Sequence, residues 1–166
     1  MPSNKPAVHL AWTSPINPTG TTPILTRAQI WKGLERKVRH AEEFVGGAIS
    51  STEVIEETED EKGYEMVVRD VMFSETQQKT REYCVLYPCM KVEFIQREGT
   101  KVINTVSDGA DGQLYMTYQF DWLFPEGADE AKRNQLSDRY MVIARTAVDK
   151  SIEAIREMVK DGRIQA

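Results

Sequence analysis

The chain has 166 residues, of which 40% are hydrophobic and 28% are charged, and its formal net charge is −5. These values are typical of a soluble domain with one core, so we expect a single domain over residues 1–166. The negative charge and the lack of basic runs argue against a nucleic-acid partner. No stretch approaches the ~20 apolar residues that a membrane span needs.

The N-terminal residues lack the basic start and apolar centre of a secretory signal, so we expect a cytoplasmic protein. Cys84 and Cys89 are too few for a disulfide framework or a zinc cluster. Histidine is limited to His9 and His40, and the acidic run at residues 56–61 lacks the order of a calcium loop. We therefore expect no metal ion and no cofactor.

Apolar and polar residues alternate over residues 8–13, which predicts a half-buried first strand. A loop rich in proline follows at residues 14–23. Thr26 and Gln29 have the spacing of a capping box, so a helix begins there. Its apolar face comprises Ile30, Trp31, Leu34 and Val38. A second short helical turn is expected over residues 41–45, which gives two short helices after the first strand.

Residues 49–124 alternate between strand patterns and short turns, which predicts six strands in an antiparallel meander. The last of these strands has the clearest pattern. Its apolar side chains all fall on one face: Leu114, Met116, Tyr118, Phe120 and Trp122.

The segment from Asp129 to Asp161 has the apolar spacing of one long helix. The predicted stripe comprises Leu136, Tyr140, Ile143, Ala147, Ala154 and Met158, and Arg156 is placed on the solvated face. Such a helix would be roughly 50 Å long. Its apolar residues lie on one face, so the helix needs a large apolar surface to pack against and would not be stable alone. We therefore predict an α+β fold in which a curved seven-stranded antiparallel sheet wraps around this helix.

A two-residue turn at residues 75–76 would place Arg69 opposite Glu82 and Asp70 opposite Arg81. The pattern leaves open which of the two faces points inward. An inward Arg69–Glu82 pair would orient a bound carbonyl or carboxylate, with Glu82 as a proton acceptor. An outward pair would be an ordinary cross-strand salt bridge.

Asn104 interrupts an otherwise apolar sheet face. Loops at residues 98–100 and 108–112 would place it opposite Phe94 and Met116, which we count as candidate ligand contacts. A buried amide needs a partner, which can be a protein group, a water molecule or a ligand.

Three tyrosines are further candidates for ligand contact: Tyr83, Tyr118 and Tyr140. A phenol can donate a hydrogen bond to a bound carbonyl while its ring lines a pocket. The alternative is that these rings are simple core.

Five segments carry a resemblance to a known family: PINP, LTRAQIWKGLERKVRHAEEFV, VVRDVMF, REYCVLYP and INTVSDGADGQLYMTYQFDW. Together with the element order, they resemble the AtaL-like group of the SRPBCC superfamily over about residues 8–125. That superfamily of helix-grip folds includes START domains, birch-pollen-allergen-like proteins and aromatic polyketide cyclases. The resemblance implies a deep pocket between sheet and long helix for an apolar or aromatic small molecule.

Two functions follow from this resemblance. The first is a cofactor-free biosynthetic enzyme for cyclisation, isomerisation or dehydration. The resemblance supplies no catalytic motif, and Arg69 and Glu82 are the candidate catalytic residues because of their predicted pairing. The alternative is a non-catalytic carrier or chaperone of an apolar metabolite or lipid. Convergent polar groups in the pocket would favour chemistry, and an isolated amide would favour carriage. The oligomeric state stays open, and an edge strand beside the first strand would allow a homodimer.

Overall fold

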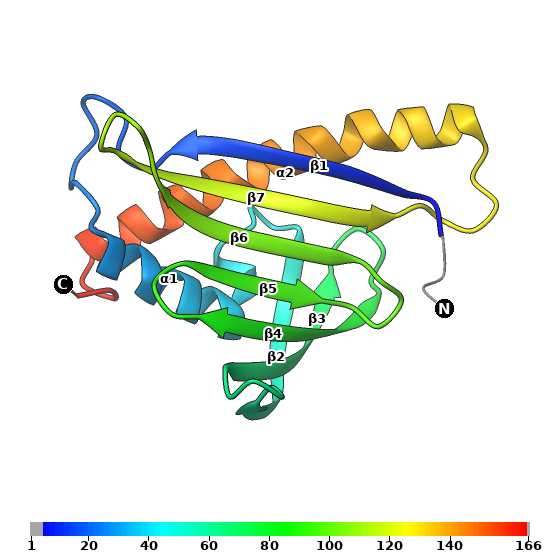
Figure 1. Ribbon diagram of the computed structural model, residues 1–166, viewed down its shortest axis with the longest axis horizontal. Coiled ribbons are helices and arrows are strands. Elements are labelled where there is room, and N and C mark those ends of the chain that lie inside the picture. The colour runs from blue at the N-terminus through cyan, green and yellow to red at the C-terminus, as the bar shows by residue number, and fades with distance from the viewer. Residues whose placement is uncertain (1–4, 166) are drawn as a thin grey trace.

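The computed structural model describes residues 5–165 (Figure 1). Its helical elements are the α-helices α1 (Arg27–Arg39) and α2 (Glu130–Lys160) and the 3-10 helix η1 (Ala41–Glu43). The strands are β1 (Ala7–Pro15), β2 (Ile49–Glu59), β3 (Glu65–Phe73), β4 (Lys79–Tyr87), β5 (Lys91–Ile95), β6 (Lys101–Asp108) and β7 (Leu114–Leu123).

Over residues 5–165, seven strands form one antiparallel sheet in the order β1-β7-β6-β5-β4-β3-β2. The sheet curls strongly, so that β2 runs across the direction of β1 and β7 in Figure 1. Helix α2 crosses behind the sheet, and α1 lies beneath one end of it. The predicted helix-grip fold is confirmed, and the second short helix is a single 3-10 turn, η1.

The predicted capping box starts α1. The Thr26 hydroxyl accepts from the Gln29 backbone N–H at 3.2 Å, and the Thr26 N–H donates to Gln29 Oε1 at 3.0 Å. The buried face of α1 includes the four predicted apolar residues and also Gln29, Gly33 and Lys37.

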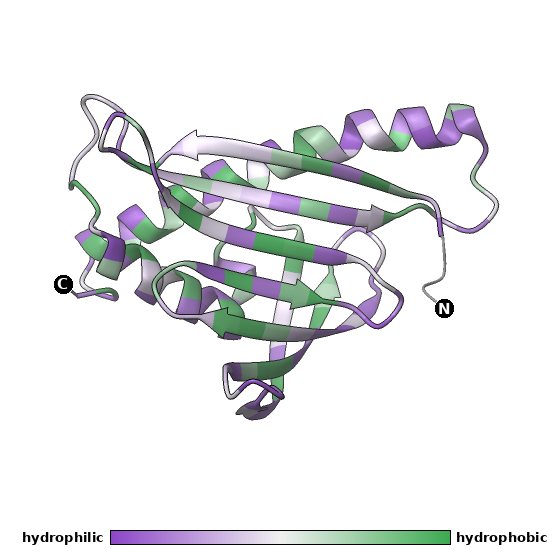
Figure 2. Ribbon diagram, in the orientation of Figure 1, coloured by the Kyte–Doolittle hydropathy of each residue, from purple (hydrophilic) through white to green (hydrophobic). Residues whose placement is uncertain are grey.

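Helix α2 begins at an Asp129 cap, whose side chain accepts from the Lys132 N–H at 2.8 Å. Figure 2 shows that hydrophilic residues dominate its first turns. The predicted stripe is correct at Leu136 and Met158, but its other members are only half-buried. The most deeply buried positions are instead Ala144, Val148, Ser151 and Ile155.

Arg156 was expected on the solvated face, and that prediction is wrong. Its side chain is buried and donates to the Ile16 carbonyl at 2.6 Å and to Asn17 Oδ1 at 3.0 Å. The guanidinium can be buried because backbone and side-chain oxygens of the proline-rich loop satisfy its donors.

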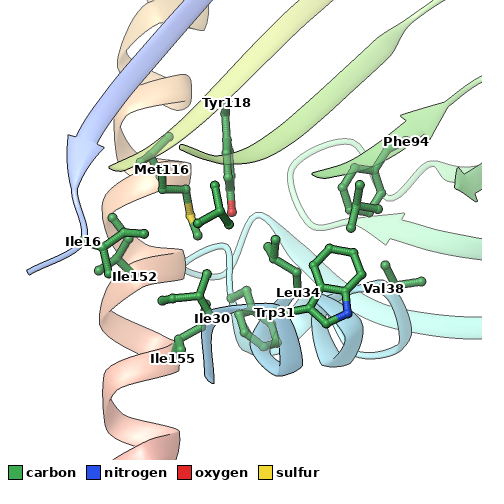
Figure 3. Close-up of a cluster of buried hydrophobic side chains, with 14 of the residues drawn as sticks. Ile16, Ile30, Trp31, Leu34, Val38, Phe94, Met116, Tyr118, Ile152 and Ile155 are labelled. Atoms are coloured by element: carbon green, nitrogen blue, oxygen red, sulfur yellow. The ribbon is translucent and has the colours of Figure 1, made fainter. Parts of the chain in front are cut away.

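One end of the concave face is packed solid by α1 and the C-terminal half of α2. Figure 3 shows Ile30 of α1 beside Ile152 and Ile155 of α2. The two helices approach so closely that a Cβ at Gly33 would lie 2.5 Å from Ile155 Cγ1. Glycine at this position therefore allows the close contact.

The strand registers follow the predictions in part. Arg69 pairs with Glu82 as predicted. Asn104 pairs with Tyr118 and Val92, so both registers predicted for β6 are wrong by two residues. The two turns span residues 96–100 and 109–113, each centred one residue away from the assumed loop. A shift of two residues keeps every side chain on its predicted face.

Candidate functional site

A cavity of about 600 Å³ opens between the concave face of the sheet and α2. Its apolar wall includes Ala41, Val45, Ile49, Phe73, Phe94, Val102, Phe120, Trp122, Val142, Ile143 and Ala147. The polar side chains on its wall are Lys37, Arg69, Ser74, Glu75, Glu82, Gln96, Asn104, Tyr118 and Thr146. Five of these, Lys37, Arg69, Glu82, Asn104 and Tyr118, are buried and are called the polar cluster below.

Lys37 projects from the last turn of α1 into the polar cluster. Its Nζ donates to Asn104 Oδ1 and to the Tyr118 hydroxyl, both at 2.8 Å. The pKa of Lys37 is lowered from 10.5 to about 7, chiefly by burial and next by the nearby Arg69 guanidinium, against the opposing effect of Glu82. A large share of this amine is therefore neutral near pH 7.

Arg69 and Glu82 face the interior, which settles the orientation that the sequence left open. Arg69 Nη2 and Nε lie 2.6 and 2.9 Å from the same carboxylate oxygen, Glu82 Oε2. The other carboxylate oxygen accepts from Gln96 Nε2 at 3.3 Å. The Asp70–Arg81 pair lies on the opposite face, where Arg81 is exposed.

Arg69 also fixes α1 on the sheet. Its Nη1 donates to the backbone carbonyls of Lys37 and Val38, both at 2.9 Å, and its guanidinium lies 4.8 Å from the Phe94 ring centroid. These carbonyls belong to the C-terminal turn of α1, where a positive charge is favourable. The pair therefore holds the end of the helix that carries Lys37.

Asn104 is fully buried, and its two amide atoms are used differently. Oδ1 accepts from Lys37, whereas Nδ2 has no hydrogen-bond partner among residues 5–165. A buried unsatisfied donor is costly unless a ligand or a water molecule accepts from it. This unpaired donor belongs to a residue that borders the cavity.

Five of the eight predicted site residues border the cavity: Arg69, Glu82, Phe94, Asn104 and Tyr118. The other three do not. Met116 is buried in the packed core (Figure 3). Tyr140 stacks against Trp122 with ring centroids 4.6 Å apart, and the Tyr83 hydroxyl accepts from Arg97 Nε at 3.0 Å. Tyr83 follows Glu82 in the same strand, so it points to the opposite face of the sheet.

The prediction from sequence missed Lys37. It lies three residues after Leu34 and seven after Ile30, which places it on the apolar stripe of α1. That spacing was the available signal. Cys84 is buried, and burial raises the pKa of its thiol to about 12, which suits an inert side chain.

Among residues 5–165, no three or more His, Cys, Asp and Glu side chains are arranged to hold a metal ion. None of the helices in this range is long and apolar enough to cross a membrane.

Solved structures with a similar fold include two aromatase/cyclases. ZhuI aromatase/cyclase from Streptomyces sp. R1128 superposes with a TM-score of 0.59 at 13% identity, covering 92% of this chain and 96% of that one. StfQ, a di-domain aromatase/cyclase from the steffimycin biosynthetic pathway, superposes with a TM-score of 0.54 at 14% identity, covering 89% of this chain and 52% of that one.

A thermophile protein shares the fold as well. TTHA0849 from Thermus thermophilus superposes with a TM-score of 0.55 at 12% identity, covering 95% of this chain and 99% of that one. At these identities the structural matches show the fold alone. No curated protein matches the sequence.

The sequence itself matches one family model, described as acetylaranotin biosynthesis cluster protein L, over residues 10–162. This match covers all of the elements that build the cavity and the polar cluster. The chain therefore belongs to the AtaL family, on a helix-grip fold of the SRPBCC superfamily.

Proposed function

We propose that the protein is a cofactor-free biosynthetic enzyme that binds an apolar, carbonyl-bearing small molecule in the cavity and catalyses its cyclisation, isomerisation or dehydration. The family description refers to a biosynthesis cluster, and two proteins of similar fold are described as aromatase/cyclases. The observation that carries the proposal is the buried polar cluster in the wall of an otherwise apolar cavity.

The free Asn104 N–H suits a carbonyl oxygen, because no group in the described part of the chain, residues 5–165, accepts from it. Glu82 is the proposed general base. Arg69 and Gln96 hold its carboxylate in a fixed orientation beside the cavity. Apolar walls exclude water and would hold a flexible substrate in a folded shape.

A carrier would need the apolar cavity but not the cluster. Five buried polar side chains converge at one place, which favours catalysis over simple ligand transport. A carrier would need no more than an isolated amide in its pocket. The presence of the five side chains is the reason for placing the enzyme ahead of the carrier.

The test uses 2-acetonaphthone as a probe, because its methyl protons exchange with D₂O only after a proton is removed from the carbon beside the carbonyl. We expect the wild-type protein to accelerate this exchange, followed by proton NMR, and Glu82→Gln to lose about 10²–10⁴-fold of the acceleration while still binding the ketone. Binding by both proteins with no exchange by either would support the carrier and contradict the enzyme.

A further inference from the structure

We propose that Lys37 is the nucleophile of this site and forms an imine with the carbonyl carbon of the bound molecule. This inference rests on the proposed function, in that it requires a carbonyl compound in the cavity.

The contacts of Lys37 are those of an amine rather than of an ion-paired ammonium. Its Nζ has two polar partners, Asn104 Oδ1 and the Tyr118 hydroxyl, and both side chains are neutral. Within residues 5–165, no carboxylate lies within ion-pair distance of Lys37, because Glu82 pairs with Arg69 instead. A buried ammonium without a carboxylate partner is unfavourable, so the neutral form gains.

Burial is the main cause of the low pKa of Lys37, and the groups that face the amine act on that pKa in both directions. Arg69 on β3 carries a positive charge that disfavours a second one, and Glu82 on β4 partly opposes this. Cys84 on β4 and Tyr118 on β7 stay neutral near pH 7, since burial raises the pKa of both. With its pKa lowered to about 7, Lys37 supplies the unprotonated amine that attacks carbonyls.

The position of the amine suits the reaction. Lys37 is only 6% exposed but borders the cavity, so a ligand bound in the cavity would lie next to it. The free N–H of Asn104 belongs to the same amide that holds Nζ through Oδ1. One side chain thus positions the nucleophile and offers a donor to the oxygen of the carbonyl under attack.

The step balances without an oxidant or a reductant. Nζ attacks the carbonyl carbon, a C–N bond forms, and a proton moves from nitrogen to the carbonyl oxygen to give a carbinolamine. Loss of water breaks the C–O bond and leaves the imine, which takes up a proton to become an iminium. The iminium withdraws electrons from the neighbouring C–H bond, which favours the loss of that proton in a cyclisation or dehydration.

The test traps the imine formed with 2-naphthaldehyde. The full chain is incubated with this aldehyde and sodium cyanoborohydride, and modified lysines are mapped by peptide mass spectrometry. We expect Lys37 to be the lysine that is labelled, with a mass gain of the aldehyde less one oxygen atom and a rate that is half-maximal near pH 7. The N-terminal amine also titrates near neutral pH, so its peptide is scored separately.

Lys32 provides the matched control, because it lies on the exposed side of the same helix. Lys32→Met should leave the labelling unchanged, and Lys37→Met should remove it while circular dichroism shows a folded protein. If Lys37→Met does not fold, the wild-type peptide map and its pH profile decide.

Binding is measured separately, by displacement of the fluorophore N-phenyl-1-naphthylamine with the aldehyde in the absence of the reductant. Binding without a Lys37 adduct, or labelling spread over surface lysines alone, would overturn the imine and leave the proposed function standing. Failure of the aldehyde to bind would overturn both.

Discussion

The two ends of the concave face differ, although the same sheet and the same helix build both. At one end, Ile152 and Ile155 of α2 pack against α1 so tightly that Gly33 has no room for a side chain. At the other end, Ile143 and Ala147 of α2 line a cavity of about 600 Å³. Helix α1 therefore fills one end of the concave face, and the space beyond its last turn stays open as the cavity.

The polar cluster lies at the boundary between these two ends. Lys37 comes from the last turn of α1, and Arg69 holds the carbonyls of that turn while it pairs with Glu82. The contacts that fasten the helix to the sheet therefore also position the groups at the cavity wall. Substitutions at the two ends and at the boundary should consequently have different effects.

The largest expected effect is at the boundary. Glu82→Ala leaves the Arg69 guanidinium buried without its carboxylate, which should lower the free energy of unfolding by about 3–5 kcal/mol. Urea denaturation measures the change. Asp70→Ala on the opposite face of the same hairpin is the control, and its partner Arg81 can turn to solvent. Equal losses in the two variants would show that the inward pair has no special structural role.

The next largest effect is at the packed end. Ile155→Ala removes a fully buried side chain between α1 and α2, and it should cost roughly 2–5 kcal/mol of unfolding free energy. Ile143→Ala, which removes a half-buried side chain from the cavity wall, should cost clearly less. Thermal or urea unfolding compares the pair, and a larger loss for Ile143→Ala would reverse the assignment of the two ends.

A smaller effect follows from the titration of Lys37. Its pKa falls from 10.5 in the unfolded chain to about 7 in the folded one, so the unfolded state binds more protons between these values. Stability should therefore rise from pH 7 to pH 9, by on the order of 2 kcal/mol. From about pH 8 the unfolded Cys84 thiol begins to ionise and opposes the trend, because burial raises its pKa from 9.0 to about 12 in the folded state.

Lys37→Met should remove this rise, which is measured as the difference in unfolding free energy between the two proteins at each pH. If the difference in unfolding free energy stays constant from pH 7 to pH 9, the charge of Lys37 in the folded protein does not change over this range. That result would contradict a pKa of about 7.

Much of the fold was predictable because local patterns specify it. The capping box at Thr26 and the Arg69–Glu82 register both follow from residue spacing, and both are present in the structure. The orientation of the central hairpin was not predictable, because Arg69–Glu82 and Asp70–Arg81 offer equivalent charge pairs on the two faces.

The candidate site was predictable only in part. Asn104 stands out in sequence because a lone amide interrupts an apolar face. Lys37 does not, since lysines usually lie on the solvated side of a helix and its burial depends on partners from β6 and β7. Met116 was misplaced because strand alternation identifies the inner face but not which part of that face α1 covers.

The central claim is that the cavity between the sheet and α2 binds an apolar small molecule. Filling the cavity with a large side chain tests this claim most directly. Ala147→Trp places an indole in the cavity from α2, whereas Asp138→Trp adds the same ring at an exposed position of the same helix. Titration with N-phenyl-1-naphthylamine should show one saturable site in the wild type and in Asp138→Trp, and at least tenfold weaker binding in Ala147→Trp. Equal binding by all three proteins would contradict the claim.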